Sequence, residues 1–243
     1  MAHVPRVLVP APLRAGQPIP LEAERAHHLY TVLRRRTGDA VCLWDGQGLE
    51  APGRLTALDA RGGSAQAETP RRIDRESPLQ LILVQALARG DRFEQAAVAA
   101  VELGAHSIQP VLAEHGQVKL KGERVARKQQ SWQRLLLGAA EQAERSRLPA
   151  LGALCSLQDW LATPRQGLLL HPEGAPLRAA CAGLDWQAPL AVVVGPEGGL
   201  SPDELRRAEA AGLRRCRLGP RILRTEHAGP AALAALAALQ GDY

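Results

Sequence analysis

Apolar residues occur in short runs separated by charged or glycine-bearing segments, and this pattern predicts alternating strands and helices. The run at 190–194 is Leu-Ala-Val-Val-Val and stops at a Gly-Pro pair. Such a run, rich in β-branched residues, is typical of a strand buried on both faces. Ser201, a proline and Glu204 then predict a helix start with a capping box, and Gly212 predicts its left-handed end. Residues 213–218 predict a second strand.

The preceding part of the chain shows the same alternation. Residues 79–87 form an apolar run, 92–103 have a helical pattern that ends before a glycine, and 107–112 form another apolar run. This strand–helix–strand order indicates a parallel sheet with crossover helices. Residues 167–173 predict a further strand. In such sheets ligands bind at the carboxyl ends of the strands, so we expect the site there.

A long basic helix is predicted at 119–142. Between Glu114 and Arg147 the chain carries 8 basic and 4 acidic residues, and apolar side chains fall on the opposite face of the helix. Pro149 is expected to end it, because proline removes a backbone donor.

The first 75 residues predict a small β-rich unit. A helical pattern covers 22–34, and an Asp-Gly pair after residue 44 predicts a hairpin turn. Short strands are predicted at 6–9, 40–44, 53–58 and 64–68. The charged segment at 71–76 ends before a Ser-Pro pair and marks a linker, which gives two domains, 1–75 and 76–243.

Composition narrows the class of protein. Apolar residues make up 46% of the chain, yet no run is long enough to span a membrane. The N-terminus lacks the apolar core of a signal peptide. Four scattered cysteines without a Cys-x-x-Cys pair argue against a zinc site or a disulfide framework and favour a reducing cytoplasm. The net charge of +5 is compatible with a nucleic-acid partner.

Two glycine-bearing loops follow the last two predicted strands. The first, at 195–200, has neither the dinucleotide-binding nor the P-loop spacing. The second carries Arg221, Arg224 and Glu226 within six residues. The glycines alone are compatible with simple turns, and the charges with a solvated loop. Two such loops at one sheet edge favour a pocket.

The residues of these loops resemble a known family. Val-Val-Gly-Pro-Glu-Gly-Gly-Leu-Ser-x-x-Glu at 193–204, followed by Leu-Gly-Pro-Arg-Ile-Leu-Arg-Thr-Glu at 218–226, is similar to the RsmE family of ribosomal RNA methyltransferases. His-His-Leu at 27–29 and Gly-Asp at 38–39 resemble its N-terminal PUA-like domain. The resemblance implies an α/β fold of the SPOUT class, with a mostly parallel, trefoil-knotted sheet behind a small β-rich PUA-like domain.

The resemblance also implies the cofactor S-adenosylmethionine and the residues that hold it. Three loops are expected to contribute Leu170, His171, Pro172, Gly195, Pro196, Glu197, Gly198, Gly199, Leu218, Gly219, Ile222, Leu223 and Arg224. It further implies RNA contacts by Arg34, Arg35 and Arg36, which neutralise phosphates. The basic run of the long helix adds Lys119 and Lys121 as predicted RNA-binding residues. A solvated helix end is the alternative interpretation of the arginine triplet. No metal is implied.

The implied reaction is methylation of N3 of a uridine in 16S, small-subunit rRNA. Arg145 or Arg224 is expected to stabilise the uracil anion, and Glu226 or Glu141 to receive the proton. Glu141 and Arg145 match a Glu-Gln-x-x-Arg element of the family, although a charged helix end is the alternative. The sequence leaves the identity of the base open.

The final helix suggests a homodimer with its sites at the subunit interface. Leucines recur every third position over 231–240 among alanines, although burial inside one chain is the alternative. Gly229-Pro230 is expected to delay this helix. The chain departs from the family at 98–99, 115–116 and His227. Methylation of tRNA or of a ribose hydroxyl, and RNA binding without catalysis, remain rival functions.

Overall fold

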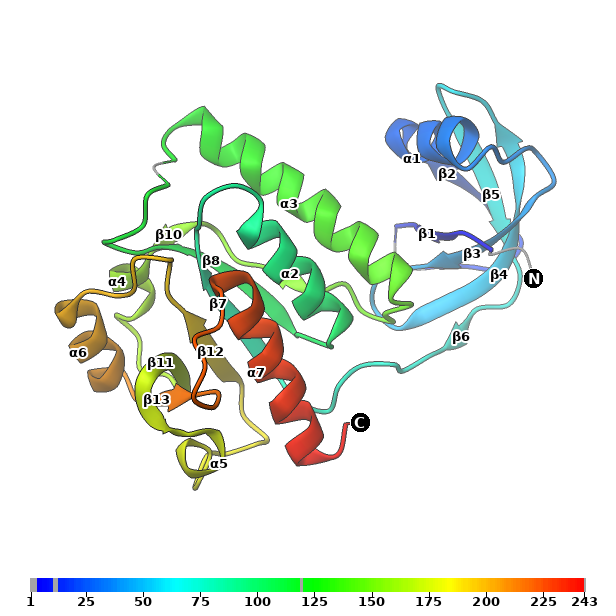
Figure 1. Cartoon of the computed structure of the whole chain (residues 1–243). Helices are drawn as coiled ribbons and strands as arrows, with labels where there is room; N and C mark the ends of the chain where they lie inside the picture. The colour runs from blue at the N-terminus through cyan, green and yellow to red at the C-terminus, as the bar shows by residue number, and fades with distance from the viewer. Residues whose placement is uncertain (1–3, 11–12, 119, 243) are drawn as a thin grey trace. The chain divides into compact units, whose positions relative to one another are not determined.

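A computed structural model describes residues 4–10, 13–118 and 120–242 of the chain (Figure 1). Its contacts divide into two units. The first comprises Met1–Glu76 and Ala140–Leu148, and the second comprises Ser77–Ala139 and Pro149–Tyr243. The predicted boundary after residue 75 stays a prediction, and the contacts group a distant segment with the first unit.

The first unit is a small, mostly antiparallel sheet. Its strands run in the order β1-β3-β4-β5-β2, and β6 pairs with β4. Val7, Leu43 and Leu55 are almost fully buried in its core. The elements are β1 (Arg6–Leu8), β2 (Pro18–Leu21), α1 (Ala23–His27), the π-helical turn η1 (His28–Val32), β3 (Ala40–Trp44), β4 (Leu49–Leu58), β5 (Gly63–Ala67) and β6 (Arg71–Arg72). The predicted helix and hairpin are confirmed, and β2 and β6 were missed.

The second unit is built on a parallel sheet with the order β10-β8-β7-β12-β11-β13, and β9 pairs with β8. Every neighbouring pair in this order is parallel. Its strands are β7 (Leu81–Ala86), β8 (Ser107–Leu112), β9 (Ala150–Leu151), β10 (Cys155–Ser156), β11 (Gly167–Pro176), β12 (Leu190–Val194) and β13 (Leu213–Arg217). The predicted parallel α/β sheet is confirmed, whereas the trefoil knot stays a prediction.

Helices cover both faces of this sheet, which explains why β12 is apolar throughout. Ala191 and Val193 pack toward α4 (Leu157–Trp160) and α6 (Pro202–Ala210). Val194 faces the other way, toward α7 (Thr225–Gln240). In Figure 1, α7 and α2 (Arg92–Glu102) lie side by side against the sheet. The remaining helices are α3 (Glu123–Gln142) and α5 (Leu177–Ala180).

The start of α6 follows its sequence closely. Ser201 Oγ accepts a hydrogen bond from the backbone of Glu204, whose side chain accepts one from the Ser201 backbone, so the predicted capping box is present. Gly212 follows the helix with a φ of 102°. The capping box at Ser201 fixes where the loop after β12 ends.

The expectation that Gly229-Pro230 delays the last helix is wrong, because α7 begins at Thr225 and contains Pro230. Proline at this position removes one backbone donor. Packing outweighs that loss. A Cβ on Gly229 would lie 2.6 Å from Leu83 Cδ1, so the glycine lets the start of the helix approach β7 closely.

The expectation that Pro149 ends the long helix is also wrong, because α3 ends at Gln142. Glu144 has a φ of 54°, a left-handed conformation that a helix does not contain. The end of the predicted range 119–142 is confirmed, and residues 145–147 make long-range hydrogen bonds in place of further helix. Among the described residues, no helix is both long and apolar enough to cross a membrane.

Candidate active site

The carboxyl ends of β11, β12 and β13 form a cavity of about 830 Å³ that shares residues with a second cavity of about 410 Å³. All thirteen residues predicted to hold a cofactor line one cavity or the other. They are Leu170, His171, Pro172, Gly195, Pro196, Glu197, Gly198, Gly199, Leu218, Gly219, Ile222, Leu223 and Arg224. The structure thus brings the three predicted loops together at one sheet edge.

Irregular backbone opens this edge. The pairing of β11 with β13 shifts register between Leu170 and Ala175, so His171 and Pro172 leave the ladder. Gly199 has a φ of 74°, which a residue with a Cβ adopts only with strain. Gly195, Gly198 and Gly199 line the cavity and carry no side chain, so this loop borders it with backbone atoms.

Thr225 fastens two of the loops to each other. Its Oγ1 donates a hydrogen bond of 2.8 Å to the carbonyl of Gly195 and accepts one of 2.9 Å from Gln85 Nε2. Gln85 is fully buried in β7. Gln85 was not among the predicted site residues, although a polar residue inside an apolar strand indicates that it has a required hydrogen-bond partner.

Arg92, the first residue of α2, also lines the cavity and was missed. Its guanidinium forms an ion pair with Glu197 of the glycine loop. Its Nε lies 3.8 Å from Glu226 Oε2. A cation at a helix N-terminus interacts unfavourably with the helix dipole. The position of Arg92 in the sequence therefore already indicated that acidic side chains compensate its charge.

Glu226 stands out among the carboxylates of the cavity. Only 6% of its surface is exposed, and its Oε2 has no hydrogen-bond partner in the described part of the chain. An unmade hydrogen bond on a buried carboxylate is costly. The carboxylate is therefore suited to accept a proton or a hydrogen bond from a ligand in the cavity.

Glu197 and Cys216, which line the cavities, have shifted pKa values. Burial by itself raises the pKa of Glu197, but hydrogen bonds from its own backbone, from Arg89 and from Arg92 outweigh it and hold the pKa below its ordinary value. Burial raises the pKa of Cys216 to about 11, with a smaller contribution from Cys181. The Cys216 thiol is therefore protonated at neutral pH and a poor nucleophile.

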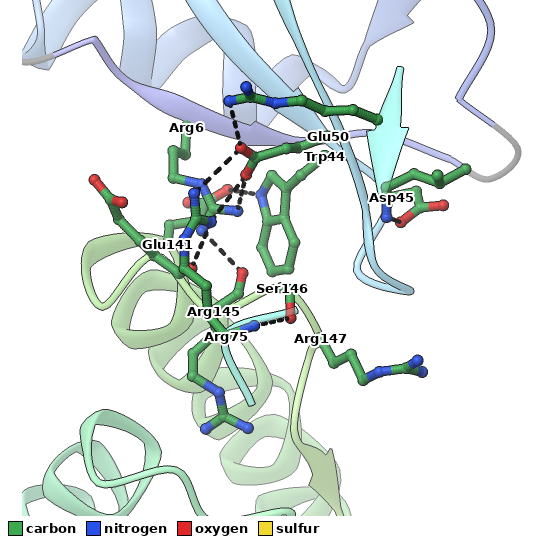
Figure 2. Close-up of polar contacts among 12 residues, drawn as sticks. Arg6, Trp44, Asp45, Glu50, Arg75, Glu141, Arg145, Ser146 and Arg147 are labelled. Carbon is green, nitrogen blue, oxygen red and sulfur yellow. Dashed lines mark hydrogen bonds and ion pairs between the residues drawn. The ribbon is translucent and has the colours of Figure 1, made fainter. Parts of the chain in front are cut away.

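Glu141 and Arg145 belong to the first unit (Figure 2). Glu141 accepts hydrogen bonds from Arg25, from the backbone of Leu8 and, at 3.4 Å, from Trp44 Nε1. Arg145 is 4% exposed and is ion-paired with Glu76. The catalytic role predicted for both stays a prediction, and these contacts favour a supporting role.

The buried Glu50 is the centre of a second cluster of ion pairs in the first unit (Figure 2). Its carboxylate pairs with Arg6, Arg71 and Arg75. Burial acts to raise the pKa of Glu50, and the hydrogen bonds and charges of the arginines lower it overall. Arg6 also stacks over the Trp44 ring at 4.7 Å. This cluster includes no predicted site residue, and its contacts indicate a structural role.

The predicted RNA-binding arginines lie directly after η1. Arg34 and Arg36 are exposed, and Arg36 stacks at 4.6 Å over the ring of Tyr30. Arg34 has a φ of 53°, which turns the chain away from the helix. Lys121 is exposed, and Lys119 lies outside the described residues.

The departures from the family pattern differ in location. His115 lies against the glycine loop, because a Cβ on Gly198 would be 3.2 Å from His115 Cβ. Val98 and Ala99 are half-buried in α2, and His227 is exposed on α7. Of these departures, His115 is therefore the one that contacts a loop lining the cavity. No group of three or more potential metal ligands occurs in the parts of the chain that the structure describes.

Comparisons with known proteins define the class first. The family model described as an RNA methyltransferase domain matches residues 75–237, and the one described as an RNA methyltransferase PUA domain matches residues 21–66. With the parallel α/β sheet and its cavity, these matches define an RNA methyltransferase with an N-terminal PUA domain.

Individual relatives narrow the class. Ribosomal RNA small subunit methyltransferase E of Bacillus subtilis is 30% identical over 91% of this chain and 92% of the relative. The crystal structure of the enzyme of that name from Neisseria gonorrhoeae, bound to S-adenosyl methionine, is 34% identical with a TM-score of 0.90, and the match covers 98% of each chain. A Legionella pneumophila methyltransferase in complex with SAM is 32% identical with a TM-score of 0.91, again over 98% of each chain. The chain belongs to the ribosomal RNA small subunit methyltransferase E family, which confirms the resemblance.

Proposed function

We propose that this protein transfers a methyl group from S-adenosylmethionine to N3 of a specific uridine in 16S, small-subunit rRNA. The observation that carries the proposal is the cavity itself. Three loops meet there at the carboxyl ends of parallel strands, and one buried carboxylate oxygen, Glu226 Oε2, has no hydrogen-bond partner among the described residues. Relatives solved with S-adenosyl methionine at about a third sequence identity support the choice of cofactor.

The residues present fit this cofactor. When bound, S-adenosylmethionine supplies a methyl group on a positively charged sulfur. Leu170, Ile222 and Leu223 provide apolar surface for the adenine, and the carbonyl and amide groups of the glycine loop provide hydrogen bonds. Holding donor and acceptor in line supplies roughly 7–11 kcal/mol of the barrier, so positioning is the main task of these loops.

Glu226 is the residue we propose as the proton acceptor. The N3–H bond of uracil breaks and its proton passes to Glu226 Oε2, while N3 forms a bond to the methyl carbon and the electron pair of the carbon–sulfur bond returns to sulfur. The proton then leaves to solvent. Arg224 is exposed at the start of α7, and we propose that it contacts the RNA beside the cavity. Glu141 and Arg145 support the first unit in this proposal.

The first unit is proposed to bind RNA through Arg34, Arg35 and Arg36, and the second unit through basic residues of α3 and through Lys121, which precedes that helix. If about six phosphates are neutralised, RNA affinity is expected to fall about a thousandfold between about 50 and 200 mM salt. Replacing the three arginines by alanine should flatten this salt dependence and leave cofactor affinity unchanged. A matched control removes three other exposed charges, Arg61, Arg72 and Arg178. Filter binding measures the RNA affinity of the two triple variants at each salt concentration. Equal effects of the two variants would reject the assignment.

The proposal includes a homodimer acting in the cytoplasm on the assembled small subunit. The resemblance supports the dimer, whereas the final helix offers less apolar surface to a partner than its sequence pattern suggested. Leu233 and Leu236 are fully buried within the single chain, and Leu239 is 37% exposed. Sedimentation at assay concentration distinguishes a dimer from a monomer. The cytoplasmic location is supported by four free cysteines and by the rRNA substrate.

Mass spectrometry of rRNA nucleosides tests the proposed function. Cells that lack the protein should lose one N3-methyluridine from small-subunit rRNA, and the purified protein with S-adenosylmethionine should restore it. Loss of a ribose methylation, or of a tRNA methylation, would assign the protein to one of the rival reactions. Unchanged nucleosides would favour RNA binding without catalysis.

A further inference from the structure

We propose that Arg92 is a catalytic residue that, with Glu226, reads the imide edge of the target base. In this role the Arg92 guanidinium donates to a uracil carbonyl oxygen beside N3, while Glu226 Oε2 accepts the N3 proton. The inference rests on the proposed function and deepens it, because it identifies the side chains that select uracil and stabilise its anion.

The geometry of the pair supports this role. Arg92 Nε and Glu226 Oε2 are 3.8 Å apart, which is too far for a hydrogen bond but close enough for charge balance. Glu226 is 94% buried, given its 6% exposure, and Oε2 has no hydrogen-bond partner within the described residues. Arg92 is less buried, with 36% of its side chain exposed, and both residues line the 830 Å³ cavity. A donor and an open acceptor therefore lie next to each other at a site of ligand size.

The pairing of Arg92 with Glu197 keeps the guanidinium in place. Glu197 lies on the glycine loop and takes one amino group of the arginine, and its lowered pKa means that it stays ionised at neutral pH. Arginine has five N–H donors in a planar fork, so this ion pair leaves further donors for a ligand. A ligand oxygen and Glu197 can thus share the same guanidinium.

The chemistry of the base matches this arrangement. The edge of uracil presents a carbonyl acceptor directly beside the N3–H donor, which is complementary to an arginine donor beside a carboxylate acceptor. Cytosine presents an acceptor at N3 and an amino donor beside it, so like groups would face each other and remain unpaired. When N3 loses its proton, negative charge spreads to the flanking oxygens. A guanidinium at one of them stabilises that charge as it develops.

A purely structural role makes a different prediction. If Arg92 served only to hold Glu197, its loss would loosen the glycine loop and weaken cofactor binding. Catalytic contact with uracil predicts a loss of kcat at unchanged cofactor affinity. The two roles are therefore separable by measuring both quantities.

The test compares Arg92→Ala with the wild-type protein on small subunits purified from cells that lack the enzyme. At saturating S-adenosylmethionine and neutral pH, kcat should fall about a hundredfold to a thousandfold, the cost of removing one anion-stabilising donor. The affinity for S-adenosylmethionine, measured by calorimetry, should stay within about twofold of wild type. Arg92→Lys should recover part of the rate, because it restores the charge without the fork.

The pH profile supplies a readout that a structural role does not move. Raising the pH ionises N3 of uracil without help from the protein, so the gap in kcat between Arg92→Ala and wild type should narrow as pH rises. Besides Arg92 and Glu226, the charged or titratable groups that line the 830 Å³ cavity are His171, Glu197 and Arg224. They are present in both proteins and contribute equally to both profiles.

Arg89→Ala is the matched control, since Arg89 is exposed and contacts Glu197 through its backbone. It should retain wild-type kcat. A constant gap at every pH, or weakened cofactor affinity with unchanged kcat, overturns the inference and leaves the proposed function intact. A wild-type protein that places no methyl group on uridine N3 overturns both.

Discussion

Replacing Glu226 by glutamine is expected to lower kcat about a hundredfold to ten-thousandfold, the usual contribution of a positioned general base. Glutamine has nearly the same size and retains one carbonyl oxygen, so the first turn of α7 keeps its packing. It does not accept the N3 proton. Methyl transfer to small subunits measures the rate, and calorimetry with S-adenosylmethionine should give an affinity close to that of wild type.

Two control variants make this result specific. Glu173→Gln removes an exposed carboxylate on the loop that contains His171, and it should leave kcat unchanged. Glu141→Gln tests the alternative base that the sequence left open. Because the Glu141 carboxylate already accepts three hydrogen bonds in the first unit, this variant should lose stability and keep kcat. A large loss of kcat in Glu141→Gln with normal activity in Glu226→Gln would reverse the assignment.

The three loops of the cavity were predictable because their signals are local. A capping box, a proline at the first helical position and a glycine with positive φ each act within a few residues, so the sequence around Ser201 determines where the loop ends. Parallel order then places the loops at one edge. The particular ligand came from the motif at 193–226, since local rules give a pocket without its occupant.

The contacts that complete the site were not predictable, because they join residues far apart in the chain. Gln85 and Thr225 are 140 positions apart, and Arg92 and Glu197 are 105 apart. Only the folded sheet places them together. The early start of α7 has the same origin. Pro230 disfavours this early start locally, but the close packing of Gly229 against β7 stabilises it.

The segment at 140–148 illustrates the same limit and leads to the second prediction. The local pattern predicted a helix that continues to Pro149, yet Glu76, 69 to 71 positions away, holds the segment by hydrogen bonds. Glu76 Oε1 accepts hydrogen bonds from the backbone of Ser146 at 2.9 Å, from Ser146 Oγ at 3.0 Å and from the backbone of Arg147 at 3.0 Å. Its Oε2 accepts one of 2.8 Å from Arg145 Nε and a second from the same guanidinium.

Replacing Glu76 by alanine is therefore expected to lower the free energy of unfolding by about 3–5 kcal/mol, as is typical when one partner of a buried ion pair is removed. The side chains of Arg145 and Glu76 are only 5% and 14% exposed, so the arginine charge would remain buried without its carboxylate. Denaturant titration followed by circular dichroism measures the loss. Glu68→Ala, at an exposed position in the first unit, should change stability by no more than about 0.5 kcal/mol. A loss in Glu76→Ala no larger than in this control would contradict the prediction.

The pH dependence of the same variant checks the physical cause. Burial acts to raise the pKa of Glu76, but the hydrogen bonds and charge of Arg145, with those from Arg147 and Ser146, lower it below its ordinary 4.5. A carboxylate whose pKa is lower in the folded protein stabilises it fully above the unfolded pKa and loses that contribution as the pH falls through the folded pKa. The stability difference between wild type and Glu76→Ala should therefore be constant at neutral pH and shrink in acid below about pH 4.5. A difference that stays constant through this range would mean that packing, and not the ionised carboxylate, holds the segment.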